Sequence, residues 1–324
     1  MSERERFDEL EAALAAVFSG RDVPGDVGDE PRDLALLAGY LLGLPREEFR
    51  ASLKADLVRP GAPAPEEKRE PEAAEVTPQT VIPYVVVPRA EQLMDFVREA
   101  FGATEVLRSA GSGGFHGEVR IGGTQLMMGG RPGMSWPESL ATLHLYVPDV
   151  DATYRRALDA GAASLYAPAD QFYGDREAGI RDPFGNRWFI GTHKKGPSHV
   201  PEGMRSVTPF FLLRGASEWM ELVKQAFGAE EIGRVGLPEG GVRYARMRIG
   251  DSILEMGEAH GEHAASTPAM LYVIVEDVDA AYTRAVAGGA QAVEAPTLQP
   301  YGARVGHVKD SRGNDWYLAT PVRR

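Results

Sequence analysis

One long sequence occurs twice between residues 81 and 322 of this 324-residue chain, and this repeat limits the possible folds more than any other feature. The copies match at an offset of 126 residues near their start and of 128 residues afterwards, because the second copy carries a two-residue insertion. Clear matches are 100–103 with 226–229, 149–151 with 277–279, and 182–188 with 310–316. Matches in the same order along both copies indicate two copies of one module.

Each copy is itself a weaker repeat of a pattern of strands and a helix. In the first copy an apolar stretch at 85–87 precedes a helical pattern at 90–101, and a second apolar stretch at 143–147 precedes another at 150–160. A Gly-Ala pair follows each helical pattern, as expected where a left-handed glycine caps a helix. The sequence therefore predicts an α+β fold of two tandem modules. Each module has two βαβββ units forming a curved eight-stranded sheet, with helices on the convex face and a pocket on the concave face.

The region before the repeat has a different composition. Three short apolar periodicities predict an α-helical region over residues 1–58, and a proline-rich stretch predicts a linker over 59–80. The modules then span 81–194 and 205–322. The first 80 residues hold 18 of the 47 acidic side chains but only 10 of the 35 basic ones, so most of the net charge of −12 belongs to this region. We expect these helices to pack on the body of the protein or on a second copy of the chain, through which the chain could self-associate.

Composition argues against several classes of protein. No stretch is apolar enough to span a membrane, although 43% of the residues are hydrophobic. The acidic net charge argues against a surface that follows nucleic-acid phosphates. The absence of cysteine removes disulfides, thiolate nucleophiles and sulfur-ligated metals. Because the N-terminus also lacks the pattern of a secretory signal, we expect a cytoplasmic protein.

A set of short motifs gives a more specific signal. In the first copy they are Pro-Tyr-Val-Val-Val at 83–87, Phe-Gly-Ala at 101–103, Val-Pro-Asp-Val-Asp at 147–151, Tyr-Gly-Asp-Arg at 173–176 and Asp-Pro-Phe-Gly-Asn-Arg-Trp at 182–188, and the second copy repeats most of them. These motifs resemble the vicinal oxygen chelate superfamily of glyoxalase, bleomycin-resistance and extradiol dioxygenase proteins, in particular its PhnB-like branch. The resemblance covers residues 81–321 and implies the fold predicted above. Function has to be argued from the site, because one fold hosts many chemistries.

The resemblance also implies a divalent metal held by four side chains in each module, one near the start of the first strand and one near the end of the fourth strand of each unit. These positions are Pro83, Met127, His144 and Phe189 in the first module, and Pro209, Glu255, Tyr272 and Tyr317 in the second. Proline and phenylalanine carry no ligand atom, a thioether is soft, and neutral tyrosine is a poor ligand. Neither set is complete, so we expect no cofactor; a divalent metal bound weakly by His144 and Glu255 is the alternative.

In many members of this superfamily each cavity combines the first unit of one module with the second unit of its partner, and here the partner is fused. Such pairing would make a pseudo-dimer of modules within the chain and would bring Glu255 and His144 into one pocket. Met127, Tyr272 and Tyr317 would fall in the other. We therefore expect two unequal pockets, one with a carboxylate and an imidazole and one aromatic and apolar.

His144 and Glu255 are the candidate catalytic residues of a catalytic site that is otherwise unknown. Alternation along 143–147 turns His144 and Tyr146 toward the cavity. Together with Glu255, the imidazole could serve as a general acid–base pair, as a weak two-ligand metal site, or as a buried hydrogen-bonded pair without a chemical role. The sequence leaves these three interpretations open.

The remaining candidates are side chains that could contact a flat organic ligand. They are Tyr146, Phe172, Tyr173, Phe189, Tyr272, Tyr301, Tyr317, Met127 and His116. We expect His193 to be exposed in the connector between modules and His260 and His263 to lie in a polar loop, whereas His307 belongs to no motif.

The first functional hypothesis is a small-molecule-binding protein with degenerate metal sites, similar to the bleomycin-resistance relatives. One alternative is a metal-dependent lyase, isomerase or dioxygenase that uses Glu255 and His144. The other is a scaffold that recruits a partner through its N-terminal helices.

Overall fold

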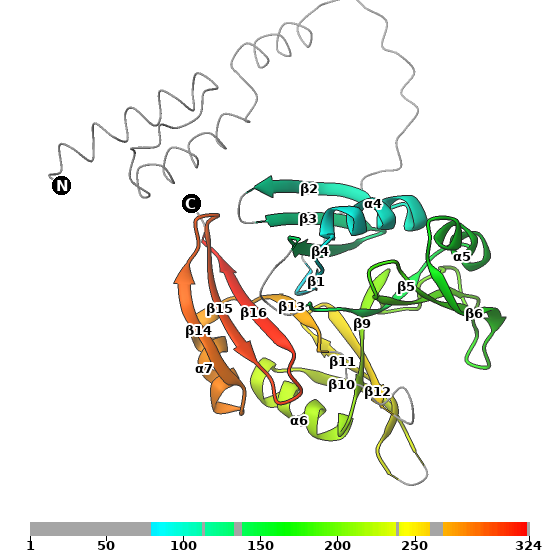
Figure 1. Ribbon diagram of the computed structural model, residues 1–324. Coiled ribbons are helices and arrows are strands. Elements are labelled where there is room, and N and C mark those ends of the chain that lie inside the picture. The colour runs from blue at the N-terminus through cyan, green and yellow to red at the C-terminus, as the bar shows by residue number, and fades with distance from the viewer. Residues whose placement is uncertain (1–78, 112–113, 133–137, 238–239, 260–267, 323–324) are drawn as a thin grey trace, which may run out of the picture. The chain divides into compact units, whose positions relative to one another are not determined.

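The computed structural model describes residues 79–324, apart from 112–113, 133–137, 238–239, 260–267 and 323–324 (Figure 1). The chain divides into two compact units, Met1–Glu72 and Ala73–Arg324, and all described residues belong to the second. The predicted helices of 1–58, all but the end of the predicted linker, and the predicted loop with His260 and His263 lie outside the described residues.

The second unit contains the predicted strand, helix and three strands four times. The first module holds β1 (Val81–Val86), α4 (Ala90–Phe101), β2 (Thr104–Gly111), β3 (Gly114–Ile121) and β4 (Thr124–Gly130), then β5 (Thr142–Tyr146), α5 (Val150–Asp159), β6 (Ala163–Asp170), β7 (Asp175–Arg181) and β8 (Arg187–His193). The second module holds β9 (Val207–Leu213), α6 (Ala216–Phe227), β10 (Glu230–Gly236), β11 (Val242–Ile249) and β12 (Ser252–Glu258), then β13 (Met270–Ile274), α7 (Val278–Ala287), β14 (Gln291–Leu298), β15 (Ala303–Lys309) and β16 (Asp315–Pro321). The predicted α+β fold is confirmed.

The strands form the two predicted eight-stranded sheets, but each sheet joins one unit from each module and not, as first predicted, the two units of a single module. The first sheet has the order β14-β15-β16-β13-β1-β4-β3-β2, and the second has the order β10-β11-β12-β9-β5-β8-β7-β6. At their centres β1 runs antiparallel to β13, and β5 runs antiparallel to β9. The two units of one module therefore lie in different sheets, because the free edges of β1 and β5 are taken by strands of the second module. This is the exchanged pairing that makes a pseudo-dimer within the chain.

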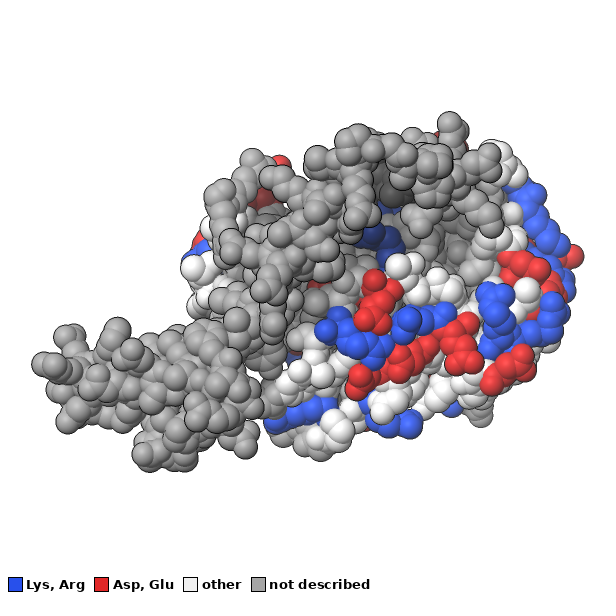
Figure 2. All heavy atoms as spheres, turned by 90° about the horizontal axis from the view of Figure 1, so that it is seen from above, with Lys and Arg blue, Asp and Glu red and all other residues white. Residues whose placement is uncertain are grey.

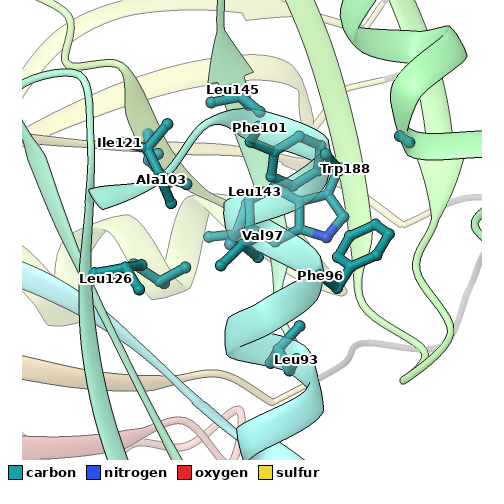
Figure 3. Close-up of a cluster of buried hydrophobic side chains, with 14 of the residues drawn as sticks. Leu93, Phe96, Val97, Phe101, Ala103, Ile121, Leu126, Leu143, Leu145 and Trp188 are labelled. Carbon is teal, nitrogen blue, oxygen red and sulfur yellow. The ribbon is translucent and has the colours of Figure 1, made fainter. Parts of the chain in front are cut away.

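Each module nevertheless keeps its own hydrophobic core on the helical side of the sheets. Figure 3 shows the core of the first module, in which Phe96, Val97 and Phe101 of α4 lie near Trp188 and Leu93 lies further along the same helix. That core also takes side chains from β4 of the first sheet and β5 of the second, including Leu126, Leu143 and Leu145. A matching core around Trp219 and Trp316 belongs to the second module. The modules are thus units of packing, whereas the sheets are formed between modules.

Local signals in the sequence account for the helix ends. Gly102 and Gly228 end α4 and α6 with φ angles of 70° and 67°, a left-handed conformation in which glycine has no side-chain strain. Asp149 and Asp277 begin α5 and α7, and each carboxylate accepts a hydrogen bond from the backbone N–H three residues later. These signals fix where the chain leaves each helix to enter the next strand.

The repeated motif at 182–188 and 310–316 forms the turn of a β-hairpin, and a buried aspartate stabilises that turn through hydrogen bonds. The buried Asp182 carboxylate accepts hydrogen bonds from the Asn186 amide and the Trp188 indole, and from the backbone N–H groups of Phe184 and Asn186. Asp310 does the same in the second module and also accepts the indole N–H of Trp219. Burial raises the pKa of Asp182, and these donated hydrogen bonds oppose that rise. The motif therefore joins each β-hairpin to the core of its module.

The surface of the described part is mixed in charge. Figure 2 shows acidic and basic side chains side by side on one face. On β2, for example, Arg108 pairs with Glu91 and Asp95 of α4 and with its neighbour Glu105. Among the described residues, no helix combines the length and apolar character needed to cross a membrane.

Candidate functional site

The second sheet brings His144 and Glu255 together on its concave face, as the exchanged pairing predicts. His144 lies on β5 and Glu255 on β12, separated by the single strand β9. Their side chains are joined by a hydrogen bond of 3.1 Å between His144 Nδ1 and Glu255 Oε2. Both are buried, with Glu255 only 1% exposed. The predicted meeting of these two side chains is confirmed, and it depends on one strand from each module.

Other side chains of the second sheet occupy the remaining oxygens of this site. Tyr244 on β11 donates to Glu255 Oε1. Glu177 on β7 lies 3.6 Å from His144 Nε2, which has no hydrogen-bond partner. Tyr166 and Tyr173 both donate to Glu177, over 2.6 Å and 2.9 Å. The imidazole thus lies between two carboxylates, and each carboxylate accepts at least one hydrogen bond from a tyrosine hydroxyl.

The electrostatics of this network favour a protonated imidazole. Burial lowers the pKa of His144, but the charge and hydrogen bond of Glu255, with the charge of Glu177, outweigh burial and raise that pKa above 6.5. For Tyr244 and Tyr166, burial and the adjacent carboxylates raise the pKa above its usual range, so both hydroxyls keep their protons and donate. The arrangement stabilises one positive charge in a buried position.

A pH dependence of stability follows from the raised pKa of His144. A pKa raised by folding stabilises the protein fully below the unfolded value of 6.5, and this stabilisation is lost as pH rises through the folded value. We expect the unfolding free energy of the native chain to fall relative to that of His144→Gln as pH rises from 6 to 9. Urea denaturation at intervals of pH measures this difference, with His199→Gln as control. Parallel profiles for the native chain and His144→Gln would contradict the expectation.

Three further predicted contacts lie on the second sheet or in its β6–β7 turn. Tyr146 stacks on His144 with ring centroids 4.3 Å apart, and its hydroxyl donates to the buried Asp175. Phe189 packs edge-on against Phe210 at 5.5 Å. Tyr173 is 43% exposed at the edge of this network.

The structure contradicts the expected exposure of His193 for a local reason, and it places Phe172 at the surface. His193 is half-buried rather than exposed, because it ends β8 and its Nδ1 hydrogen bonds to Asp175 over 2.6 Å. Phe172 is 95% exposed in the turn between β6 and β7, where it contacts the ring of Tyr173. Its side chain therefore lies on the surface, outside a closed pocket.

The first sheet, in contrast, carries an open cavity of about 870 Å³ on its concave face. Its polar and aromatic lining comes from both modules. The lining residues include Tyr84, Phe115, His116 and Glu138 from the first module and His307, Lys309, Asp315 and Tyr317 from the second. Two of the predicted ligand contacts, His116 and Tyr317, line this cavity. The structure therefore has two unequal concave faces, and the open one carries charged side chains beside its aromatic ones.

The remaining candidates on this sheet lie next to the cavity. Tyr272 is beside Tyr317 in the parallel pair of β13 and β16, and its hydroxyl hydrogen bonds with Tyr301. Tyr301 is 69% exposed. Met127 on β4 is buried opposite Tyr84 of β1. These positions place tyrosines, rather than metal ligands, around the centre of the sheet.

The two metal-ligand positions expected on β1 and β9, Pro83 and Pro209, are each one residue away from a residue that faces the concave side. Pro83 pairs with Leu271, and Pro209 pairs with Leu143, and both leucines belong to the helix-side cores. Directly opposite residues share a face, so both prolines point toward the helices and the alternation turns Tyr84 and Phe210 toward the concave faces. The side chains that replace the prolines, a neutral tyrosine and a phenylalanine, also fail to complete a metal site. Within the described residues, no group of three or more His, Asp or Glu side chains is arranged to hold a metal ion.

Sequence reasoning missed several side chains of both faces. Glu177 and Tyr244 belong to no motif in the sequence. Glu177 nevertheless lies beside His144, and Tyr244 donates a hydrogen bond to Glu255. Tyr84 was missed because Pro83, its neighbour on β1, was expected on the concave face in its place. His307 matches Gly179 of the first module, so comparison of the two copies gave no signal for it; only its alternation on β15 with Lys309 could have placed it on the concave face.

Comparison with known proteins agrees with this architecture. A family model described as the glyoxalase/bleomycin resistance protein/dioxygenase superfamily matches residues 78–190 and 214–318. An uncharacterised protein of Mycobacterium bovis is 40% identical over 122 residues, which are 34% of this chain and 80% of that protein. Glyoxalase I from Zea mays has a TM-score of 0.59 at 13% identity, over 75% of this chain and 92% of its own. A putative dioxygenase from Bacillus subtilis has a TM-score of 0.52 at 13% identity, over 76% and 86%. These two structures share the fold.

Proposed function

Because the chain belongs to the glyoxalase/bleomycin resistance protein/dioxygenase superfamily, we propose that it uses the concave face of one sheet to bind a small organic molecule without a resident metal. The ligand is flat and partly apolar, and it occupies the cavity of the first sheet. The single observation that carries this proposal is that cavity, whose volume of about 870 Å³ is within the range of small-molecule sites.

The contrast between the two sheets supports the choice of cavity. On the second sheet, tyrosine hydroxyls and His144 already bind the carboxylates of Glu255 and Glu177. A ligand there would have to displace these buried hydrogen bonds, which costs free energy. On the first sheet the corresponding positions of His144 and Glu255 hold Tyr272 and Met127, and the space in front of the sheet is open. Binding therefore needs less rearrangement on the first sheet.

The alternative of a metal-dependent enzyme built on Glu255 and His144 has less support. The two side chains are hydrogen bonded to each other, and the other family positions around them supply no further ligand. Their arrangement agrees better with a buried pair that stabilises the exchanged sheet. The proposal of a scaffold rests on residues 1–58, which lie outside the described part of the chain.

A probe-binding experiment with two matched variants tests the proposal. Ser109 on β2 lines the first cavity and pairs with His116 of β3, and Val235 on β10 pairs in the same way with Tyr244 of β11 in the second sheet. Both side chains are exposed, so tryptophan fits at either position without entering a core. We expect the neutral flat probe N-phenyl-1-naphthylamine to bind the native chain, Ser109→Trp to weaken binding at least about tenfold, and Val235→Trp to leave it unchanged.

Fluorescence titration of the full chain measures these affinities, and circular dichroism checks that both variants are folded. Failure of the native chain to bind the probe would overturn the proposal. Loss of binding in Val235→Trp but not in Ser109→Trp would move the site to the second sheet and would also overturn it.

A further inference from the structure

The side chains that line the first cavity indicate which chemical class of ligand it can bind. The inference rests on the proposed function, which places the ligand in this cavity. On one side, four side chains form a hydrogen-bonded chain. His116 Nε2 lies 3.1 Å from Glu118 Oε1, and His116 Nδ1 lies 3.0 Å from the hydroxyl of Tyr84. Gln125 donates to the other oxygen of Glu118 over 2.6 Å. The carboxylate is thereby fixed in place behind the imidazole.

This chain sets the direction of the Tyr84 hydroxyl. A carboxylate can only accept, so His116 Nε2 carries a proton, and in the neutral ring Nδ1 is an acceptor. In this neutral tautomer Tyr84 donates a hydrogen bond to His116 Nδ1 and keeps its proton, and the lone pairs of its oxygen remain available at the cavity. Burial, followed by nearby tyrosines and Glu118, raises the pKa of Tyr84 to about 12, so the hydroxyl stays protonated near neutral pH. Tyr84 therefore offers the cavity a hydrogen-bond acceptor.

The opposite side of the cavity repeats this arrangement with different residues. His307 Nε2 lies 2.7 Å from Asp315 Oδ1, and its ring stacks on Tyr317 at 4.2 Å between centroids. Lys309 also pairs with Asp315, over 3.3 Å, so its ammonium charge is directed to that carboxylate. In the neutral tautomer that donates Nε2–H to Asp315, Nδ1 of His307 is an acceptor. Each half of the first sheet thus contributes an imidazole held by a carboxylate.

The charges around the cavity have a negative balance. Among its lining residues, the carboxylates of Glu138 and Asp315 face a single ammonium group, that of Lys309, and Glu118 adds a third carboxylate behind His116. An anionic ligand would meet unfavourable charge at short range, whereas a neutral or cationic ligand would not. The aromatic rings of Tyr84, Phe115 and Tyr317 supply apolar surface for a flat molecule.

We propose that the ligand of the first cavity is a planar aromatic molecule, neutral or cationic, that donates hydrogen bonds through a phenolic hydroxyl, an amine or a ring N–H group. Tyr84 Oη and His307 Nδ1 are its acceptors, and the carboxylates of Glu118 and Asp315 fix these acceptors in the required form. Aromatic carboxylates, which present only acceptors and a negative charge, are excluded from the class.

Isothermal titration calorimetry of the full chain with three naphthalene derivatives tests this assignment. 2-Naphthol presents a donor, 2-methoxynaphthalene has nearly the same shape without a donor, and 2-naphthoate carries a negative charge. We expect 2-naphthol to bind about tenfold more tightly than the methyl ether, and 2-naphthoate to bind most weakly. Tyr84→Phe removes one acceptor and is expected to abolish most of the preference for 2-naphthol. Tyr244→Phe, which removes a tyrosine hydroxyl from β11 of the second sheet, keeps the preference and serves as the control.

The outcomes separate this inference from the proposed function. Equal binding of 2-naphthol and its methyl ether, or strongest binding of 2-naphthoate, would overturn the ligand class while leaving a binding cavity in place. A preference for 2-naphthol that survives Tyr84→Phe but is lost in Tyr244→Phe would overturn the assignment to the first cavity. Absence of binding for all three compounds and for N-phenyl-1-naphthylamine would overturn the proposed function itself.

Discussion

Replacement of Glu255 by alanine is expected to lower the free energy of unfolding by about 3–5 kcal/mol, the usual cost of removing one partner from a buried ion pair. Glu255 is 1% exposed and binds both His144 and Tyr244. Without it, the imidazole loses its hydrogen-bonded partner, and the Tyr244 hydroxyl loses its acceptor. Urea denaturation at pH 6, where His144 is protonated in the folded chain, measures the loss.

The internal repeat supplies the matched control for this experiment. The positions of Glu255 and His144 correspond to Met127 and Tyr272, which are compatible with the same strand pairing in the first sheet. The double variant Glu255→Met with His144→Tyr should therefore be more stable than Glu255→Ala, because it leaves no isolated buried charge. A double variant less stable than Glu255→Ala, or an unchanged stability of Glu255→Ala, would contradict the role of the pair in holding the exchanged sheet.

The second large effect is expected for Asp310. Its carboxylate accepts five hydrogen bonds, from the indoles of Trp219 and Trp316, the Asn314 side chain, and the backbone N–H groups of Arg312 and Asn314. Asp310→Ala leaves these buried donors without an acceptor, so we expect a loss of about 3 kcal/mol or more in the free energy of unfolding.

Asp182 provides an internal comparison for Asp310. In the first module the position of Trp219 is occupied by Leu93, so Asp182 accepts one indole rather than two. Asp182→Ala should therefore cost less, about 2 kcal/mol, in the same urea titration. Equal losses for the two variants would show that the second indole does not contribute to stability.

The sequence predicted the units of this fold well because their signals are local. The helical pattern at 90–101 became α4 with the same bounds, and Gly102 ends it in the predicted left-handed conformation. The partners of β1 and β5 could not be read from periodicity, because an apolar strand edge does not specify which distant strand pairs with it. The exchange followed only from family resemblance, and the hydrogen bond between His144 and Glu255 confirms it.

The candidate sites were harder to predict than the fold. Pro83 was expected on the concave face of β1, but Tyr84 occupies that face, because successive side chains of a strand point to opposite faces and the prediction was wrong by one residue. The network of the second sheet depends on Glu177 of β7, on Tyr166 of β6 and on Tyr173 of the turn between these strands. Tyr244 joins it from β11, on the far side of the sheet. Such a network arises from tertiary structure, and no short motif encodes it.

The exchange of units between sheets also sets the order in which the chain can complete its folding during synthesis. When the first module has left the ribosome, its helices can already pack on their own core, but one edge of β1 and one edge of β5 have no partner. The edge of β5 stays open until β9 has been made, and that of β1 until β13 has been made, nearly 190 residues after β1. Until then the nascent chain exposes two strand edges that could pair with another copy. The proposed ligand cavity is therefore completed only by the last unit of the chain.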